Sequence, residues 1–207
     1  MTGVIDFLNR RFSADSSGSL RNALLAAGMA ALSACQAPAP SGPEGSWSIL
    51  PAGAARLTLN LAGLPGEARH ARFRSADGRY IEETAQWGGD SGAPSAGVRL
   101  SEASPGPPLT DPDGPNAIIP SWTALQDKRP AFTEPGSAQA AFGPVSWWRA
   151  SLGTAVCVLF LHRLPPQQTA AATLSGYYCN PPGSPLSSDA AVTVVQSIGL
   201  RPRPEGQ

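Results

Sequence analysis

The sequence predicts an α+β domain in which an antiparallel sheet of about seven strands carries a C-terminal helix. Three observations lead to this class. Short segments alternate between apolar and polar residues, tight-turn sequences separate several of them, and the last apolar segment repeats with helical spacing. A β-sandwich is the alternative that the same strands allow.

The first expected strand covers residues 57–61, where leucine occupies every second position. Such alternation is typical of a strand with one buried face. The glycine- and proline-containing segment 63–66 then predicts a turn. Residues 97–103 are expected to form a later strand of the same sheet.

A hairpin is expected around Asp77-Gly78, which lies between two strand-like segments. Glycine adopts a positive φ at low cost, so this dipeptide favours a tight two-residue turn. Pairing across that turn places Arg72 opposite Glu83. Because opposite charges on facing strands attract, this pair favours the predicted register.

The middle of the domain has few regular elements in this prediction. Residues 104–116 contain five prolines and are expected to form a loop. Residues 120–126 are expected to form a short helix that stops before Pro130. Residues 129–141 have a loop-like composition.

The C-terminal third gives the clearest pattern. Segments 145–152, 154–162 and 173–179 are rich in apolar, β-branched and aromatic residues, and each predicts a strand. Because residues 156–161 are apolar without interruption, this strand is expected to be central and covered on both faces.

The predicted C-terminal helix covers residues 187–200. Ser187 is a favourable N-cap, and Asp189 places a negative charge in the first turn. Apolar residues recur along one side, Gly199 fits the position after the last helical residue, and Pro202 prevents continuation.

The N-terminal segment, residues 1–34, is predicted to be a signal peptide. Arg10, Arg11 and Arg21 precede an uncharged apolar stretch at residues 23–34. As a helix this stretch would span about 18 Å, well below the ~30 Å of a bilayer core. A positive region followed by a short apolar region is typical of secretion signals. Arg10-Arg11 leaves open a twin-arginine export route.

Residues 32–35, Leu-Ser-Ala-Cys, resemble the lipobox of bacterial lipoproteins. The resemblance implies that the thiol of Cys35 receives a diacylglyceryl group and that the signal is cut just before it. In that family an aspartate after the cysteine often retains the protein at the inner membrane. Gln36 stands there, so the resemblance implies the outer membrane, with the domain facing the periplasm.

The domain organisation follows from these boundaries. Residues 35–55 are rich in proline, alanine and glycine, as expected of a tether that holds a domain away from the bilayer. Residues 56–200 are expected to form a single α+β domain. Residues 201–207 are expected to form a tail.

Cys157 and Cys179 are expected to form a disulfide if Cys35 carries lipid and the domain lies in an oxidising compartment. The midpoint between them falls in a polar turn near residue 168. A hairpin centred there places the two cysteines directly opposite each other, within bridging distance.

The hypothesis that the chain is an enzyme rests on a single motif. Residues 89–94, Gly-Asp-Ser-Gly-Ala-Pro, resemble the nucleophile motif of trypsin-like serine proteases, with Ser91 as the nucleophile. His70 lies too close in sequence to match the family's histidine, and the domain is too short for its double barrel. A structural turn is the competing interpretation.

Composition limits the possible functions. The formal net charge is zero, which excludes the basic excess of a dedicated nucleic-acid binder. No cofactor motif is found, and the spacing of histidines and cysteines predicts no metal site.

The favoured hypothesis is a lipid-anchored, non-enzymatic binding or assembly module with a protein partner in the envelope. A serine hydrolase using Ser91 and a small-ligand carrier are the alternatives.

Overall fold

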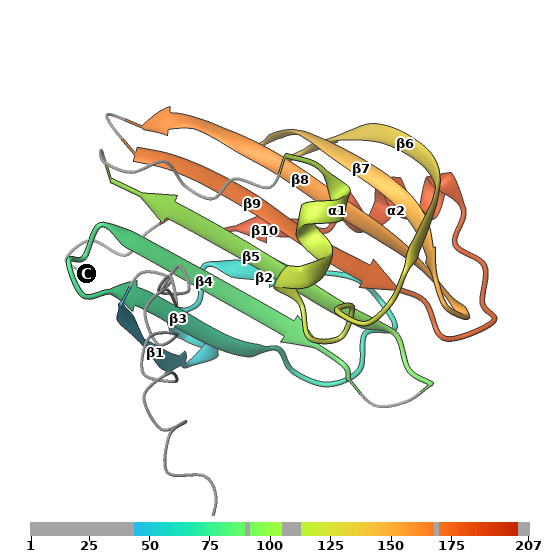
Figure 1. Cartoon of the computed structure of the whole chain (residues 1–207), viewed down its shortest axis with the longest axis horizontal. Helices are drawn as coiled ribbons and strands as arrows, with labels where there is room; N and C mark the ends of the chain where they lie inside the picture. Colours follow the sequence, from blue (N-terminus) through green and yellow to red (C-terminus); the bar gives the residue numbers. More distant parts are fainter. Residues whose placement is uncertain (1–43, 90–91, 105–112, 168–169, 203–207) are drawn as a thin grey trace, which may run out of the picture. The chain divides into compact units, whose positions relative to one another are not determined.

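A computed structural model describes residues 44–89, 92–104, 113–167 and 170–202. These residues form an eight-stranded antiparallel sheet in the order β1-β3-β4-β5-β9-β8-β7-β6, and a two-stranded sheet of β10 and β2 (Figure 1). The elements are β1 (Gly45–Leu50), β2 (Leu57–Leu59), β3 (Arg69–Ser75), β4 (Tyr80–Trp87), β5 (Ser95–Ala103), β6 (Pro130–Ala140), β7 (Gly143–Leu152), β8 (Ala155–Gln167), β9 (Ala170–Cys179), β10 (Ile198–Leu200), α1 (Pro115–Ile118), α2 (Ser188–Gln196) and the 3-10 turns η1 (Ala52–Ala54) and η2 (Ile119–Ser121).

The predicted α+β class is wrong, because the described fold is dominated by antiparallel strands. Its two α-helices have only four and nine residues. The expected helix 187–200 divides into α2 and the short strand β10. Ser187 does cap α2, accepting a hydrogen bond from the backbone N–H of Ala190. Gly199 lies tightly against Thr58 of β2, a contact that a side chain would prevent.

Strand β6 lies in the segment predicted to be a loop, residues 129–141. Proline in a strand removes a hydrogen-bond donor, which argued for a loop. The structure tolerates Pro130 and Pro135 because β6 is the last strand of the sheet and pairs only with β7. The helix expected at residues 120–126 does not form. The 3-10 turn η2 ends at Ser121, and residues 123–127 are turns.

Part of the segment predicted to be a tether, residues 35–55, forms regular elements of the domain. Strand β1 and the turn η1 both lie within it, and β1 pairs with β3 along its whole length. Regular structure is therefore present from Gly45 onward, inside the segment that the composition predicted to be a tether.

The two predicted hairpin registers are confirmed. Arg72 lies opposite Glu83 in the β3–β4 pair, and their side chains form an ion pair of 2.8 Å. Cys157 lies opposite Cys179 in the β8–β9 pair. Strand β8 is also central, as expected, with buried side chains on both faces of the sheet.

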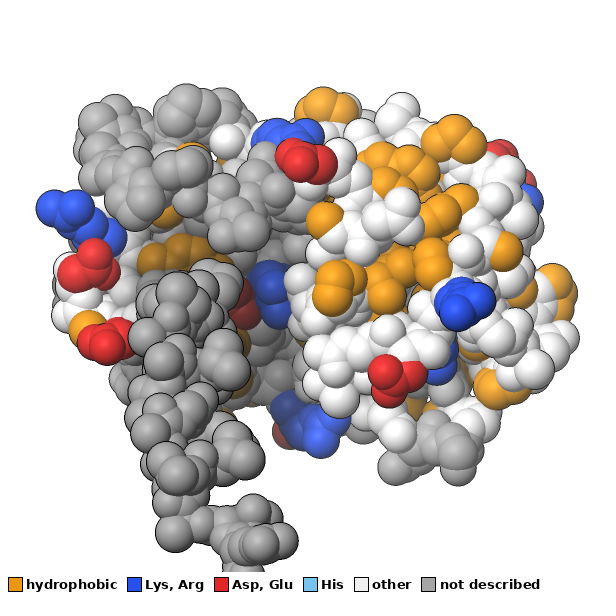
Figure 2. All heavy atoms as spheres, in the orientation of Figure 1, with side chains coloured by type: hydrophobic (Ala, Val, Ile, Leu, Met, Phe, Trp, Pro, Cys, Tyr) orange, Lys and Arg blue, Asp and Glu red, His pale blue; other side chains and the backbone are white. Residues whose placement is uncertain are grey.

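The large sheet has two covered faces. On the face that we call the α2 face, Val98, Phe160 and Leu174 pack with β2, β10 and α2. On the opposite face, which we call the α1 face, Trp122 and Leu159 belong to a second cluster that includes α1 and η2. Hydrophobic side chains gather on the half of the α1 face that carries α1 and β6 (Figure 2).

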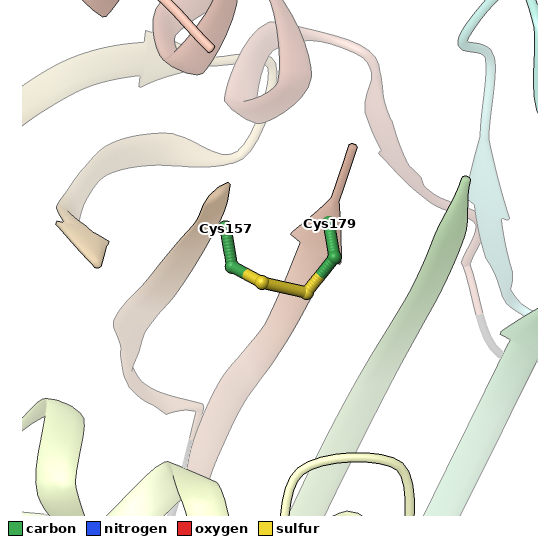
Figure 3. Close-up of a disulfide and its surroundings, with 2 residues drawn as sticks. All are labelled: Cys157 and Cys179. Carbon is green, nitrogen blue, oxygen red and sulfur yellow. A yellow bond between two sulfur atoms is a disulfide. The ribbon is translucent and has the colours of Figure 1, made fainter. Parts of the chain in front are cut away.

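The Cys157–Cys179 disulfide joins neighbouring strands within the second cluster (Figure 3). The two Cα atoms are 4.0 Å apart and both residues are buried. The bridge therefore links two central strands whose apolar neighbours also hold them in register.

Replacing both cysteines with alanine should lower the free energy of unfolding by about 3 kcal/mol, because the bridge limits the entropy of the unfolded chain. Urea unfolding followed by tryptophan fluorescence measures this difference. The far-UV circular dichroism should not change, since the apolar contacts of β8 and β9 remain. Reaction of both thiols with a thiol reagent in the native parent chain would contradict the pairing.

Candidate functional site

Strand β1 forms one end of the large sheet, and no described strand pairs with its outer edge. Its side chains alternate between the faces, so Trp47 and Ile49 lie on the α1 face. Trp47 is 57% exposed and Ile49 is 90% exposed. Among the described residues, only Phe132 is a further large hydrophobic residue of this exposed class.

A groove of about 670 Å³ lies beside these two residues, between β1 and the η2 segment. We call it the β1 groove. Apolar and polar groups both line it, among them the side chains of Trp47, Ile49, Arg69, Arg99 and Trp122. Such a mixture suits a contact in which apolar groups provide binding energy and a few polar groups provide specificity.

The wall of the β1 groove is fixed by a chain of polar contacts. The Tyr80 hydroxyl donates to Glu82 at 2.6 Å, and Glu82 lies 3.1 Å from the Arg99 guanidinium. Arg99 in turn donates to the Ser121 carbonyl and lies over the Trp122 ring. Burial, with the hydrogen bond to Glu82, raises the pKa of Tyr80 to about 12, so the hydroxyl keeps its proton at neutral pH.

An aromatic row continues from this wall to the exposed edge. The ring of Phe73 is 5.9 Å from that of Tyr80 and 5.5 Å from that of Trp47. Trp47 therefore packs on one side against a fixed neighbour and presents its other side to solvent. This arrangement gives β1 an apolar surface that is held in one position.

The opposite end of the sheet is built differently. Strand β6 contains two prolines and an irregular pairing between Phe132 and Glu134. Glu134 pairs with Arg149 at 2.9 Å and accepts a hydrogen bond from Ser188 of α2. Prolines, bulges, charges and a covering helix are the features by which proteins prevent unwanted strand pairing.

Strand β1 lacks those protections. Its sequence, Gly-Ser-Trp-Ser-Ile-Leu, contains no proline and no charged residue, and its pairing with β3 shows no irregularity. An open, regular and partly hydrophobic edge is suited to strand addition by another chain. Within the part of the chain that the structure describes, the contrast with β6 identifies β1 as the edge that is available for contact.

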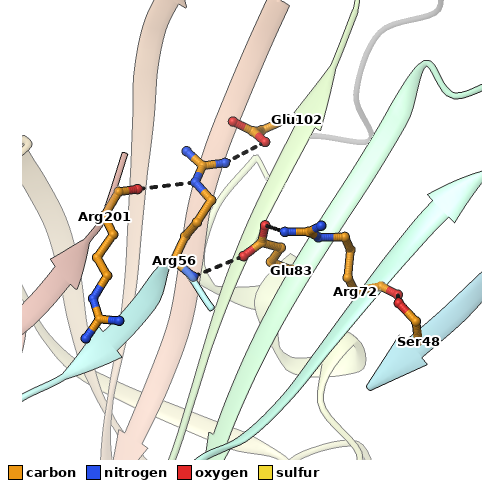
Figure 4. A network of polar contacts seen from close by, with 6 residues as sticks. All are labelled: Ser48, Arg56, Arg72, Glu83, Glu102 and Arg201. Atoms are coloured by element: carbon orange, nitrogen blue, oxygen red, sulfur yellow. Dashed lines mark hydrogen bonds and ion pairs between the residues drawn. The ribbon is translucent and has the colours of Figure 1, made fainter. Parts of the chain in front are cut away.

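A second hollow, of about 520 Å³, lies over the ends of β4 and β5 near β10. Arg56 enters it and pairs with Glu102 at 2.8 Å, while its Nε donates to the Arg201 carbonyl (Figure 4). Beneath this pair, Glu83 accepts from the backbone N–H of Arg56 and from the side chain of Arg72. These contacts tie β2 and the segment after β10 to the sheet.

His70 lies beside this network, at the edge of the Trp87 ring. Burial lowers its pKa, and the nearby Glu83 carboxylate partly offsets that effect. His70 is therefore mainly neutral at pH 7. Ser91, the nucleophile of the hydrolase alternative, lies outside the described residues, as does Cys35.

The described residues contain no group of three or more His, Cys, Asp and Glu side chains that could hold a metal ion. Over the same residues, no helix combines the length and the apolar character that a membrane crossing requires.

His162 is buried beside Phe142, and its Nδ1 lies 2.6 Å from the Pro144 carbonyl oxygen.

Comparison with known proteins gives no assignment: no family model and no curated protein matches this chain.

The sequence prediction missed the β1 edge altogether, because prolines and glycines around it resemble a tether. One signal was present. In residues 45–50 the apolar Trp47 and Ile49 alternate with Ser46 and Ser48, which is the two-residue period of a strand. The network around Arg56 had no such signal, since its members lie far apart in the sequence.

Proposed function

We propose that this chain is a lipid-anchored protein of the bacterial envelope that acts as a non-enzymatic binding or assembly module. In this proposal Cys35 carries the lipid, and the domain contacts a protein partner on the periplasmic side of the outer membrane. The lipobox-like sequence supports the anchor. The Cys157–Cys179 disulfide is consistent with an oxidising compartment outside the cytoplasm.

The observation that carries the binding role is the difference between the two ends of the sheet. One end is protected by prolines, a bulge and α2, while β1 presents an open edge beside two exposed hydrophobic side chains. Interfaces depend on a few such large apolar residues in fixed positions. The β1 edge and the β1 groove together are therefore the proposed contact surface.

The double variant Trp47→Ala/Ile49→Ala should weaken partner binding at least tenfold, because it removes both exposed hydrophobic side chains of this surface. A tagged copy of each lipidated protein is cross-linked in native membranes beside an untagged copy and recovered by affinity capture. Quantitative mass spectrometry then measures every protein recovered with the tagged copy, including the untagged copy. The yield of the specific partner should fall in proportion to the lost affinity.

Phe132→Ala is the matched control, since Phe132 is 37% exposed but lies on the protected strand β6. It should leave partner recovery unchanged. Equal recovery with the double variant and the parent chain would exclude the β1 edge as the contact surface. Thermal unfolding of all three proteins establishes that each is folded.

A further inference from the structure

We propose that the partner bound at β1 is a second copy of this chain, paired antiparallel through its own β1 strand. The two large sheets would then join into one continuous sheet around a twofold axis at Ser48. This inference rests on the proposed function in one respect, since the shared lipid anchor is what brings two copies to one membrane.

The backbone of β1 has the required hydrogen-bonding groups at its outer edge. The N–H of Ala76 donates to the Glu44 carbonyl at 2.7 Å, across the β1–β3 pair. Because bonding direction alternates along an antiparallel strand, Ser46 and Ser48 also direct their backbone groups toward β3. The backbone groups of Gly45, Trp47 and Ile49 therefore point away from the sheet.

The side chains of β1 are complementary to those of a second β1 strand when the twofold axis passes through Ser48. When Ser48 lies opposite the partner's Ser48, Trp47 lies opposite the partner's Ile49, and Ile49 opposite the partner's Trp47. Aromatic–aliphatic pairs of this kind stabilise neighbouring strands. Since residues 45–50 carry no charge, the two edges approach without like-charge repulsion. A twofold contact uses the same surface on both copies.

The length of the N-terminal segment permits this arrangement. Nine peptide steps separate Cys35 from Glu44 and span at most about 30 Å. In the paired strands the two Glu44 residues are about 27 Å apart along the strand direction. Both segments can therefore reach one bilayer. Confinement to that bilayer raises the effective concentration of each copy for the other.

A second copy also explains the surface better than direct insertion into lipid. Trp47 and Ile49 could enter a bilayer, but the outward backbone groups of β1 would lose their hydrogen bonds to water there. Strand pairing satisfies those groups and covers the two side chains at the same time. Strand pairing with a second copy therefore accounts for both the unpaired backbone edge and the exposed side chains of β1.

The test is cysteine cross-linking of the full, lipidated protein in native membranes. In the proposed register, residue 48 and its copy form a non-hydrogen-bonded pair with Cα atoms about 4.5 Å apart, which a disulfide can bridge. Cys157 and Cys179 are such a pair, because the neighbouring Asn180 N–H donates to Val156 and their own Cα atoms are 4.0 Å apart. Ser48→Cys should therefore form a covalent dimer under mild oxidation.

Ser46→Cys is the matched control, because it changes the same residue type on the same face of β1. Residue 46 and its copy would be about 13 Å apart, too far for a disulfide. Adding Ile49→Lys to Ser48→Cys should reduce the dimer at least tenfold, since it places charge at the interface. The unchanged parent chain accounts for any dimer formed through Cys35.

A dimer with Ser48→Cys, little with Ser46→Cys, and twice the chain mass for the detergent-extracted parent protein support the proposal. A monomeric parent protein, equal cross-linking of both cysteine variants, or cross-linking to a different protein or to none overturns it. Fractionation of the same samples tests the anchor separately. Dimer in a soluble fraction would contradict the lipid anchor, whereas a membrane-bound monomer would contradict only the pairing.

Discussion

Replacing Cys35 with serine should release the protein from the membrane fraction, or leave it as an uncleaved precursor. In the proposed lipoprotein, the Cys35 thiol is the only attachment point for lipid, and a hydroxyl does not replace it. Two or more acyl chains anchor a protein firmly because each buried CH₂ contributes about 0.8 kcal/mol. Immunoblotting of membrane and soluble fractions measures the change, and intact mass identifies the processed form.

Gln36→Asp serves as the matched control, because it changes the adjacent residue and keeps the thiol. It should stay in the membrane fraction, with a shift from the outer to the inner membrane if the family's sorting signal applies. Normal cleavage and full membrane retention of the Cys35→Ser protein would contradict the lipid anchor. The structure of the domain would be unaffected by either result.

The parts of the fold that sequence predicted correctly are those fixed by local chemistry. Asp77-Gly78 gave the β3–β4 register, because the turn type sets which residues face each other. The pairing of Cys157 with Cys179 was predicted from a hairpin centred near residue 168. That pairing is found, although an irregularity between Leu164 and Gln167 shifts the register by one residue close to the turn. Ser187 was correctly placed as the cap of α2, since capping depends on neighbouring backbone groups.

The errors occurred where tertiary position overrides local preference. Strand β6 contains prolines that only an edge strand accepts, and edge position is not visible in a single sequence. Residues 198–200 continue the apolar pattern of α2 but become β10, because β2 supplies a strand partner from far along the chain. The predicted α+β class failed for the same reason.

The candidate site divides in the same way. The proposed lipid attachment at Cys35 rests on a local motif and stays a prediction, since Cys35 lies outside the described residues. The β1 surface depends instead on which strand ends the sheet. Exposure of Trp47 and Ile49 follows from that position and from no feature of their neighbours in sequence. The long-range polar contacts could not be predicted from the sequence either. Arg56 contacts Glu102 and Arg201 only because the order of the strands brings them together.

Glu83 is the residue of this polar network whose removal should destabilise the domain most. Its side chain is 4% exposed, and its carboxylate joins two elements, with Arg72 at 2.8 Å and the backbone N–H of Arg56 at 3.4 Å. Desolvation of a charge is costly, and the cost is offset only while the opposite charge is present. Loss of the carboxylate therefore affects the ion pair and the attachment of the segment before β2.

Glu83→Ala should lower the free energy of unfolding by about 3–5 kcal/mol, because it breaks a buried ion pair by removing one member. Glu134→Ala is the matched control: its ion pair with Arg149 is equally short at 2.9 Å, but Glu134 is 39% exposed. That loss should stay below about 1 kcal/mol. Urea unfolding of both variants and the parent chain measures the difference.

A second readout separates electrostatics from packing. The negative charge of Glu83 raises the pKa of His70 against the larger opposite effect of burial. In Glu83→Gln, which keeps the side-chain volume, the pKa of His70 should fall further below its ordinary value, as measured by NMR titration of the imidazole. An unchanged His70 titration, together with equal destabilisation by Glu83→Ala and Glu134→Ala, would show that burial of this carboxylate contributes nothing specific to the fold.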